Sequence, residues 1–145
     1  GECAFFKCTS LTQITIPSSV TIIKNGVFEK CSSLTQVIIP SSVTSIGNEA
    51  FWGCSSLTQI RIPSSVTEIG YGVFTDCLSL TQILIPSSVK KIGDYAFIGC
   101  SSLKQISLPS ALEDIGKLLV SIQMCLFQPI NDTKLQFSDA VNFIA

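Results

Sequence analysis

Seven cysteines are the residues of this sequence with the widest chemistry, since a thiol can form a disulfide, bind a metal or act as a nucleophile. Five of them recur every 23 residues, namely Cys8, Cys31, Cys54, Cys77 and Cys100. Disulfide scaffolds and zinc sites use closely spaced pairs of cysteines, which this series lacks. We therefore expect the five to be small buried apolar residues, whereas Cys3 and Cys125 lie outside the series and are candidates for an exposed thiol.

The remaining composition predicts no catalytic residues, no metal ligands and no cofactor. The sequence contains no histidine, which excludes Ser–His and Cys–His nucleophiles and imidazole metal ligands. It also contains no glycine-rich phosphate loop. The 9 basic residues are balanced by 10 acidic ones without a basic block, so we expect no nucleic-acid partner. Every apolar run is interrupted before the ~20 residues that a membrane-spanning helix needs.

The cysteine spacing belongs to a longer repeat with the consensus L-T-Q-I-x-I-P-S-S-V-T-x-I-G-x-x-A-F-x-x-C-S-S. Apolar residues at its positions 1, 4 and 6 form the L-x-x-I-x-I pattern of a strand whose alternate side chains enter a core. The proline then ends the strand, because it has no N–H to continue a ladder. In the second repeat, Val43 and Ile46 return to the core, and Ala50, Phe51 and Cys54 close the coil.

A single repeat has too few apolar residues to bury a core, so the repeats must stack on one another. We expect a repeat solenoid with one parallel strand per coil in a single-layer sheet. The phenylalanines at one repeat position should then stack inside it, namely Phe5, Phe28, Phe51, Phe74 and Phe97. Glu68, Lys91 and Asp114 are also 23 residues apart and should form one exposed column of alternating charge.

The motif L-x-x-I-x-I-P-S-S-V-T-x-I-G-x-x-A-F-x-x-C resembles the BspA-type leucine-rich repeat. The resemblance implies a right-handed leucine-rich-repeat solenoid, with strands on one face and irregular or short helical turns on the other. It further implies a non-enzymatic protein-interaction module from a surface antigen or adhesin, placed at the cell surface, whose partner is a host matrix or cell-surface protein. A cytoplasmic leucine-rich-repeat adaptor or regulatory subunit is the alternative, and a structural spacer is a third hypothesis.

The predicted solenoid covers residues 1–116, with a partial repeat at 1–10 and further repeats that begin at residues 11, 34, 57, 80 and 103. Gly1 aligns with the repeat glycine, so we expect the sequence to begin inside a repeat, either as a fragment or as a gene model that has lost its start. Residues 117–145 depart from the motif and are interpreted as a cap, a degenerate sixth repeat or an unrelated tail. Asn131 begins a glycosylation sequon that is relevant only if the protein is secreted.

The outward side chains of the predicted strands form the candidate protein-binding face. One column is Gln13, Gln36, Gln59, Gln82 and Gln105, whose stacked amides can also simply bond one another. The other is Thr15, Ile38, Arg61, Leu84 and Ser107, which differs in every copy while its flanks stay nearly constant. A binding surface requires such variation on a constant scaffold, although drift at an exposed site gives the same pattern. Trp52 follows the repeat phenylalanine and suggests a second contact area on the outer flank, although single exposed apolar residues are normal on a protein surface.

Overall fold

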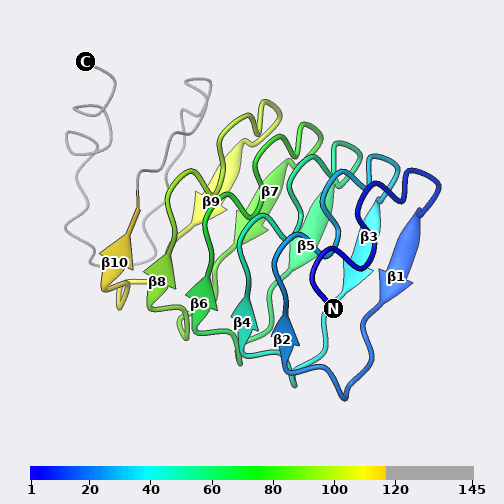
Figure 1. Ribbon diagram of the computed structural model, residues 1–145. Helices are drawn as coiled ribbons and strands as arrows, with labels where there is room; N and C mark the ends of the chain where they lie inside the picture. The colour runs from blue at the N-terminus through cyan, green and yellow to red at the C-terminus, as the bar shows by residue number, and fades with distance from the viewer. Residues whose placement is uncertain (117–145) are drawn as a thin grey trace.

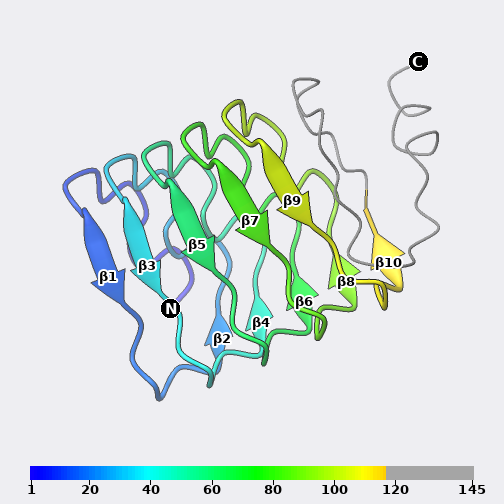
Figure 2. The same ribbon diagram turned by 180° about the vertical axis from the view of Figure 1, so that it is seen from behind.

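The computed structural model describes residues 1–116 as a stack of coils, each with two short strands on two different faces (Figures 1 and 2). The three-residue strands make the long-strand face: β1 Gln13–Thr15, β3 Gln36–Ile38, β5 Gln59–Arg61, β7 Gln82–Leu84 and β9 Gln105–Ser107. The two-residue strands make the short-strand face: β2 Ile22–Ile23, β4 Ser45–Ile46, β6 Glu68–Ile69, β8 Lys91–Ile92 and β10 Asp114–Ile115. The described residues contain no helix, and the turns that join the strands are irregular.

All strand pairs are parallel and pair each residue with the one 23 positions later, as in Gln13 with Gln36. The short-strand face is one sheet in the order β10-β8-β6-β4-β2, and the long-strand face contains the ladders β1-β3 and β5-β7-β9. The two ladders are neighbours, because β3 of the first lies beside β5 of the second (Figure 2). The predicted parallel solenoid is therefore confirmed. The short-strand sheet is an addition to the single sheet that we expected.

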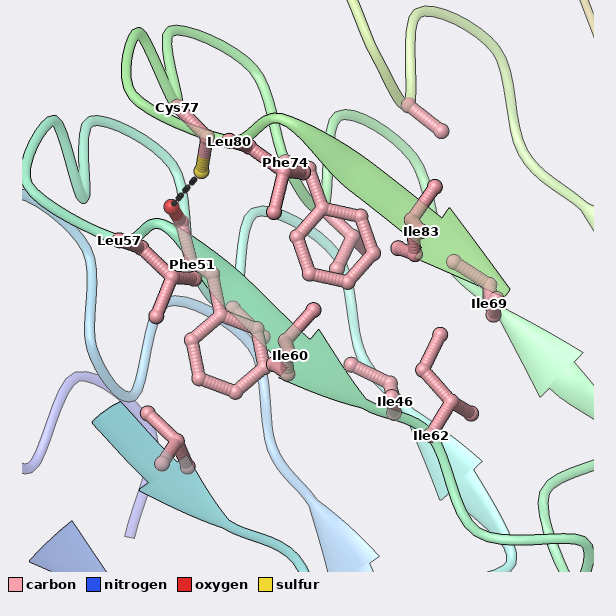
Figure 3. Packing of buried hydrophobic residues seen from close by; sticks show 14 of the residues in the cluster. Ile46, Phe51, Leu57, Ile60, Ile62, Ile69, Phe74, Cys77, Leu80 and Ile83 are labelled. Atoms are coloured by element: carbon pink, nitrogen blue, oxygen red, sulfur yellow. Dashed lines mark hydrogen bonds between the residues drawn. The ribbon is translucent and has the colours of Figure 1, made fainter. Parts of the chain in front are cut away.

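The core is a continuous column of apolar side chains from both faces and from the turns (Figure 3). In β5, Ile60 is buried between the exposed Gln59 and Arg61, as the alternation predicts. The predicted stacking of the phenylalanines is confirmed, with ring centroids 5.4 Å apart for Phe28 and Phe51. Phe5, at the end of the stack, was expected to lie inside but is 37 % exposed. Across the whole column, from Phe5 to Phe97, successive centroids are 5.4 to 5.8 Å apart. Each coil thus packs the same ring onto the same ring of its neighbours.

The expected charge column is also present on the short-strand face. Lys91 pairs in register with Glu68 on one side and with Asp114 on the other. All three side chains are exposed. Opposite charges on neighbouring strands are worth about 0.2–1 kcal/mol, so this column contributes little to stability, but it shows that the coil register continues to β10.

Polar side chains connect neighbouring coils through the backbone. The Ser42 hydroxyl donates to the carbonyl of Val20 at 2.7 Å, and Ser88 repeats this bond to Val66 at 2.7 Å. These bonds satisfy backbone groups that turns would otherwise leave without a partner. The second serine after the strand-ending proline therefore has a structural role in the stack.

The repeat glycine marks the closest approach between coils. A Cβ atom added to Gly70 would lie 2.7 Å from the backbone nitrogen of Asn48 and 2.8 Å from the carbonyl carbon of Gly47. Asn48 is itself part of this contact, because its Oδ1 accepts a bond of 2.9 Å from the backbone N–H of Tyr71. Only a residue without a side chain lets the coils approach to this distance.

Each coil also contains two residues with a left-handed backbone, with φ between 52° and 74°. The first position is occupied by Cys3, Gly26, Glu49, Gly72 and Tyr95, and the second by Lys7, Lys30, Gly53, Asp76 and Gly99. From Gly26 onward, glycine occupies one of the two positions in each coil, and the position that it occupies alternates from coil to coil. Glycine adopts this conformation without the steric penalty that other residues carry.

Candidate functional site

The variable column of the long-strand face presents large apolar groups on both sides of a cation. Ile38 is 51 % exposed and Leu84 is 62 % exposed. Arg61, also exposed, belongs to the strand between them and pairs in register with Leu84. Because neighbouring strands lie about 4.8 Å apart, the three side chains form one short continuous strip on a rigid backbone.

Thr15 extends this strip at one end, since it is exposed and pairs with Ile38. The other end is shorter than expected. Ser107 was predicted to face outward with Leu84, but only 9 % of its surface is exposed. The accessible part of the column therefore runs from Thr15 to Leu84. Strand alternation sets the direction of a side chain but does not decide what else covers it.

The glutamine column lies beside this strip and is exposed along its whole length: Gln13, Gln36, Gln59, Gln82 and Gln105. The strand register stacks them in neighbouring coils, as in Gln59 with Gln82. Among residues 1–116 no hydrogen bond joins one of these amides to another. Their donors and acceptors are therefore available to solvent or to a binding partner.

Four of the five periodic cysteines are part of the core. Cys31, Cys54, Cys77 and Cys100 are buried. The Cys77 thiol donates to the carbonyl oxygen of Phe51 at 3.3 Å (Figure 3), and the Cys54 thiol donates likewise to Phe28 at 3.2 Å. Burial raises the pKa of Cys54 and of Cys100 to about 12. A thiol with so high a pKa is a poor nucleophile and a poor metal ligand at neutral pH.

The first two cysteines of the chain differ from the buried series. Cys3 and Cys8 are both exposed and free, although Cys8 belongs to the periodic series that we expected to be buried. Within residues 1–116, no group of three or more cysteines and carboxylates is placed to hold a metal ion. The interpretation of Cys125 lies outside the described residues, as do those of Asn131 and of residues 117–145.

A hollow of about 250 Å³ opens on the turns between the two faces. Its lining consists of Glu49, Trp52, Tyr71, Thr75, Tyr95 and Ile98. The position of Trp52 on the outer flank was expected, but its two tyrosine neighbours were missed. The available signal was compositional, since the only tryptophan and both tyrosines of the chain occur at variable positions of three successive repeats.

Residues 1–116 contain no helix with the length and apolar character needed to cross a membrane.

Comparison with known proteins agrees with this architecture. The sequence pattern described as "BspA type Leucine rich repeat region" matches residues 1–126 in six copies. A leucine-rich repeat protein of T. pallidum is 34 % identical with a TM-score of 0.74, and the match covers 81 % of this chain and 61 % of that one. A search of curated proteins finds no match.

Two further solved structures are similar. A leucine-rich cell surface protein from Faecalibacterium prausnitzii A2-165 is 36 % identical with a TM-score of 0.66, over 72 % of this chain and 31 % of that one. A leucine-rich repeat protein from Bacteroides ovatus ATCC 8483 is 27 % identical with a TM-score of 0.53, and the match covers 80 % of this chain and 42 % of that one. This chain thus spans less than two thirds of the length of each of the three structures. Its repeats, fold and relatives together show that the chain belongs to the BspA-type leucine-rich repeat family.

Proposed function

We propose that this chain is a protein-interaction module that binds its partner through the long-strand face. The single observation that supports this most is the strip formed by Ile38, Arg61 and Leu84. Large apolar side chains that are more than half exposed lose contact with water when a partner covers them. Arginine and exposed apolar groups at the centre of a patch are typical anchors of protein interfaces.

The chemistry of the strip defines the partner that it fits. The Arg61 guanidinium presents a planar fork of donors that matches a carboxylate, and the two flanking residues require apolar surface on either side of that carboxylate. The neighbouring glutamine amides add donors and acceptors along the same strands. A partner segment with a carboxylate between two apolar residues is therefore complementary to this face.

We further propose that the module acts at the cell surface, as part of a surface antigen or adhesin that binds a host matrix or cell-surface protein. The similarity to a leucine-rich cell surface protein supports this location. An intracellular adaptor or regulatory subunit could use the same face, so the location must be tested separately from the binding.

The location is tested by adding protease to intact cells that express the tagged full-length protein. We expect the tag signal to be lost while a cytosolic control protein is protected. Protection of the tagged protein together with the control would contradict the surface proposal and favour the intracellular adaptor.

The binding face is tested by charge reversal. Matrix and cell-surface proteins are first screened for binding to the wild-type chain, and the binding of Arg61→Glu is then compared with that of Lys24→Glu. Both residues are exposed cations, but Lys24 follows β2 on the short-strand face, so the second variant has the same charge change at a different place. We expect a loss of affinity of about tenfold or more for Arg61→Glu alone. Equal affinities for the two variants would exclude the long-strand face.

A further inference from the structure

The hollow on the turns collects all the amphipathic aromatic residues of the chain. The sequence contains one tryptophan and two tyrosines, and Trp52, Tyr71 and Tyr95 all line this one hollow. They come from three successive coils and from three different positions of the repeat. The stacking of the coils, rather than the repeat itself, brings these rings together.

A glycine lies directly beside two residues of the lining. Glu49, Gly72 and Tyr95 occupy the same left-handed position in consecutive coils. A Cβ atom added to Gly72 would lie 3.3 Å from Oγ1 of Thr75 and 3.5 Å from Cγ of Glu49. A side chain at position 72 would therefore contact Glu49 and Thr75, both of which line the hollow.

The rings form walls rather than a flat platform. The ring centroids of Tyr71 and Tyr95 are 5.8 Å apart, and their planes are at 90°. The Trp52 indole is oriented by its Nε1, which donates to Oδ2 of Asp76 at 3.1 Å. The backbone of Tyr71 is held by its bond to Asn48. The Trp52 ring and the Tyr71 backbone are thus held in place before any ligand binds.

The charge of the hollow is negative. Glu49 is the only charged residue in its lining, and within residues 1–116 its carboxylate takes part in neither of the two salt bridges. The faces of aromatic rings also carry partial negative charge. The ammonium group of Lys30 already lies 4.9 Å from the centroid of the Trp52 ring, although Lys30 belongs to the preceding coil and does not line the hollow.

We propose that Glu49, Trp52, Tyr71 and Tyr95 form an aromatic cage that binds an alkylated ammonium group, such as the trimethylammonium group of choline. Such a group is a compact cation without N–H donors, so it needs ring faces and a nearby negative charge rather than hydrogen-bond acceptors. The hollow supplies both. This site lies on the turns and is separate from the long-strand face that we propose for protein binding.

Binding is tested by titrating the full chain with tetramethylammonium chloride, with potassium chloride added to keep the ionic strength constant. Trp52 is the sole tryptophan, so intrinsic fluorescence reports on the cage directly, and calorimetry provides an independent measurement. We expect a saturable response with a Kd of about 1–10 mM. The neutral analogue of choline, in which carbon replaces the quaternary nitrogen, should bind at least about tenfold more weakly than choline.

Two variants test the assignment of the residues. Glu49→Gln removes the negative charge with little change of shape and should weaken binding about tenfold, whereas its matched control Glu113→Gln, which removes a carboxylate that is paired with Lys90, should leave the affinity unchanged. Gly72→Asn adds a side chain against Glu49 and Thr75 of the lining and should abolish binding. Asparagine tolerates a left-handed backbone, so this variant should still fold. Circular dichroism and urea denaturation verify that each variant folds.

The source of the cation is tested by comparing choline with phosphocholine, the head group of a lipid. We expect choline to bind more tightly, because Glu49 repels the phosphate. The absence of a saturable response up to about 200 mM, equal binding of the neutral analogue, or wild-type affinity in folded Glu49→Gln and Gly72→Asn would each overturn the proposal. Equal or tighter binding of phosphocholine would overturn the role of Glu49 as the anionic wall.

Discussion

The substitution Phe51→Ala tests whether the aromatic column holds the coils together. Phe51 is fully buried, and its ring is stacked on both sides, with centroid distances of 5.4 Å to Phe28 and 5.8 Å to Phe74. Truncation of a buried phenylalanine costs about 3–5 kcal/mol through lost burial and the cavity left behind. Each aromatic pair contributes about 0.5–1.5 kcal/mol beyond its buried area. Because two pairs are lost, we expect the free energy of unfolding to fall by about 4–5 kcal/mol.

Phe5→Ala is the matched control in the same column. Phe5 is 37 % exposed and stacks only on Phe28, at 5.4 Å. Its truncation should lower the free energy of unfolding by only about 1–2 kcal/mol, since a half-open site leaves no closed cavity. Urea denaturation followed by circular dichroism measures both values, with equal m-values as the condition for comparing them. A loss below about 1 kcal/mol for Phe51→Ala, or equal losses for the two variants, would refute the reasoning.

Three further predictions concern the thiols and the close contact between coils. At pH ~8, a thiol reagent should label Cys3 and Cys8 in the folded chain and leave Cys54 unlabelled until urea is added, as peptide mass spectrometry would show. The pKa of the Cys54 thiol is about 12 in the folded chain against 9.0 for a free thiol. Between pH 9 and pH 12 only the unfolded chain ionises at this residue. The contribution of the thiol to stability is therefore complete below pH 9 and is lost as the pH rises toward 12. The stability of wild type should therefore fall more steeply above pH 9 than that of Cys54→Ala, by about 1.4 kcal/mol per pH unit, and parallel curves would contradict the assignment. Gly70→Ala should lower the free energy of unfolding by about 1–3 kcal/mol, since the added Cβ meets backbone at 2.7 Å, and a neutral effect in urea denaturation would show that the coils can separate.

The repeat made most of the fold predictable from the sequence. Constant spacing places equivalent residues above one another, so the burial of Ile60 and the stacking of Phe28 on Phe51 follow from the alignment alone. The short-strand sheet was missed because each of its strands has only two residues, as in Ser45–Ile46. No alternation can be seen in so short a segment, and its pairing depends on backbone contacts between coils.

The candidate sites were less predictable than the core. The outward direction of Arg61 and Leu84 follows from strand alternation, but the same alternation does not predict that Ser107 is only 9 % exposed. The aromatic cage was missed because Trp52, Tyr71 and Tyr95 occupy different repeat positions. An alignment of the repeats shows which residues lie in one column, but contacts between columns depend on how far each turn projects.

The alternation of glycine between the two left-handed positions has a consequence for how such a solenoid can lengthen. Gly26 and Gly72 are 46 residues apart, as are Gly53 and Gly99, so neighbouring coils are of two kinds and only every second coil is alike. Duplication of a segment of two coils would reproduce junctions that already exist in the molecule. Duplication of a single coil would instead place two like coils together and create a junction that the present chain does not contain. Between Gly26 and Gly99 the unit that repeats with the same glycine placement is therefore the pair of coils, and we expect a designed longer stack to preserve its junctions when it is extended in steps of two coils.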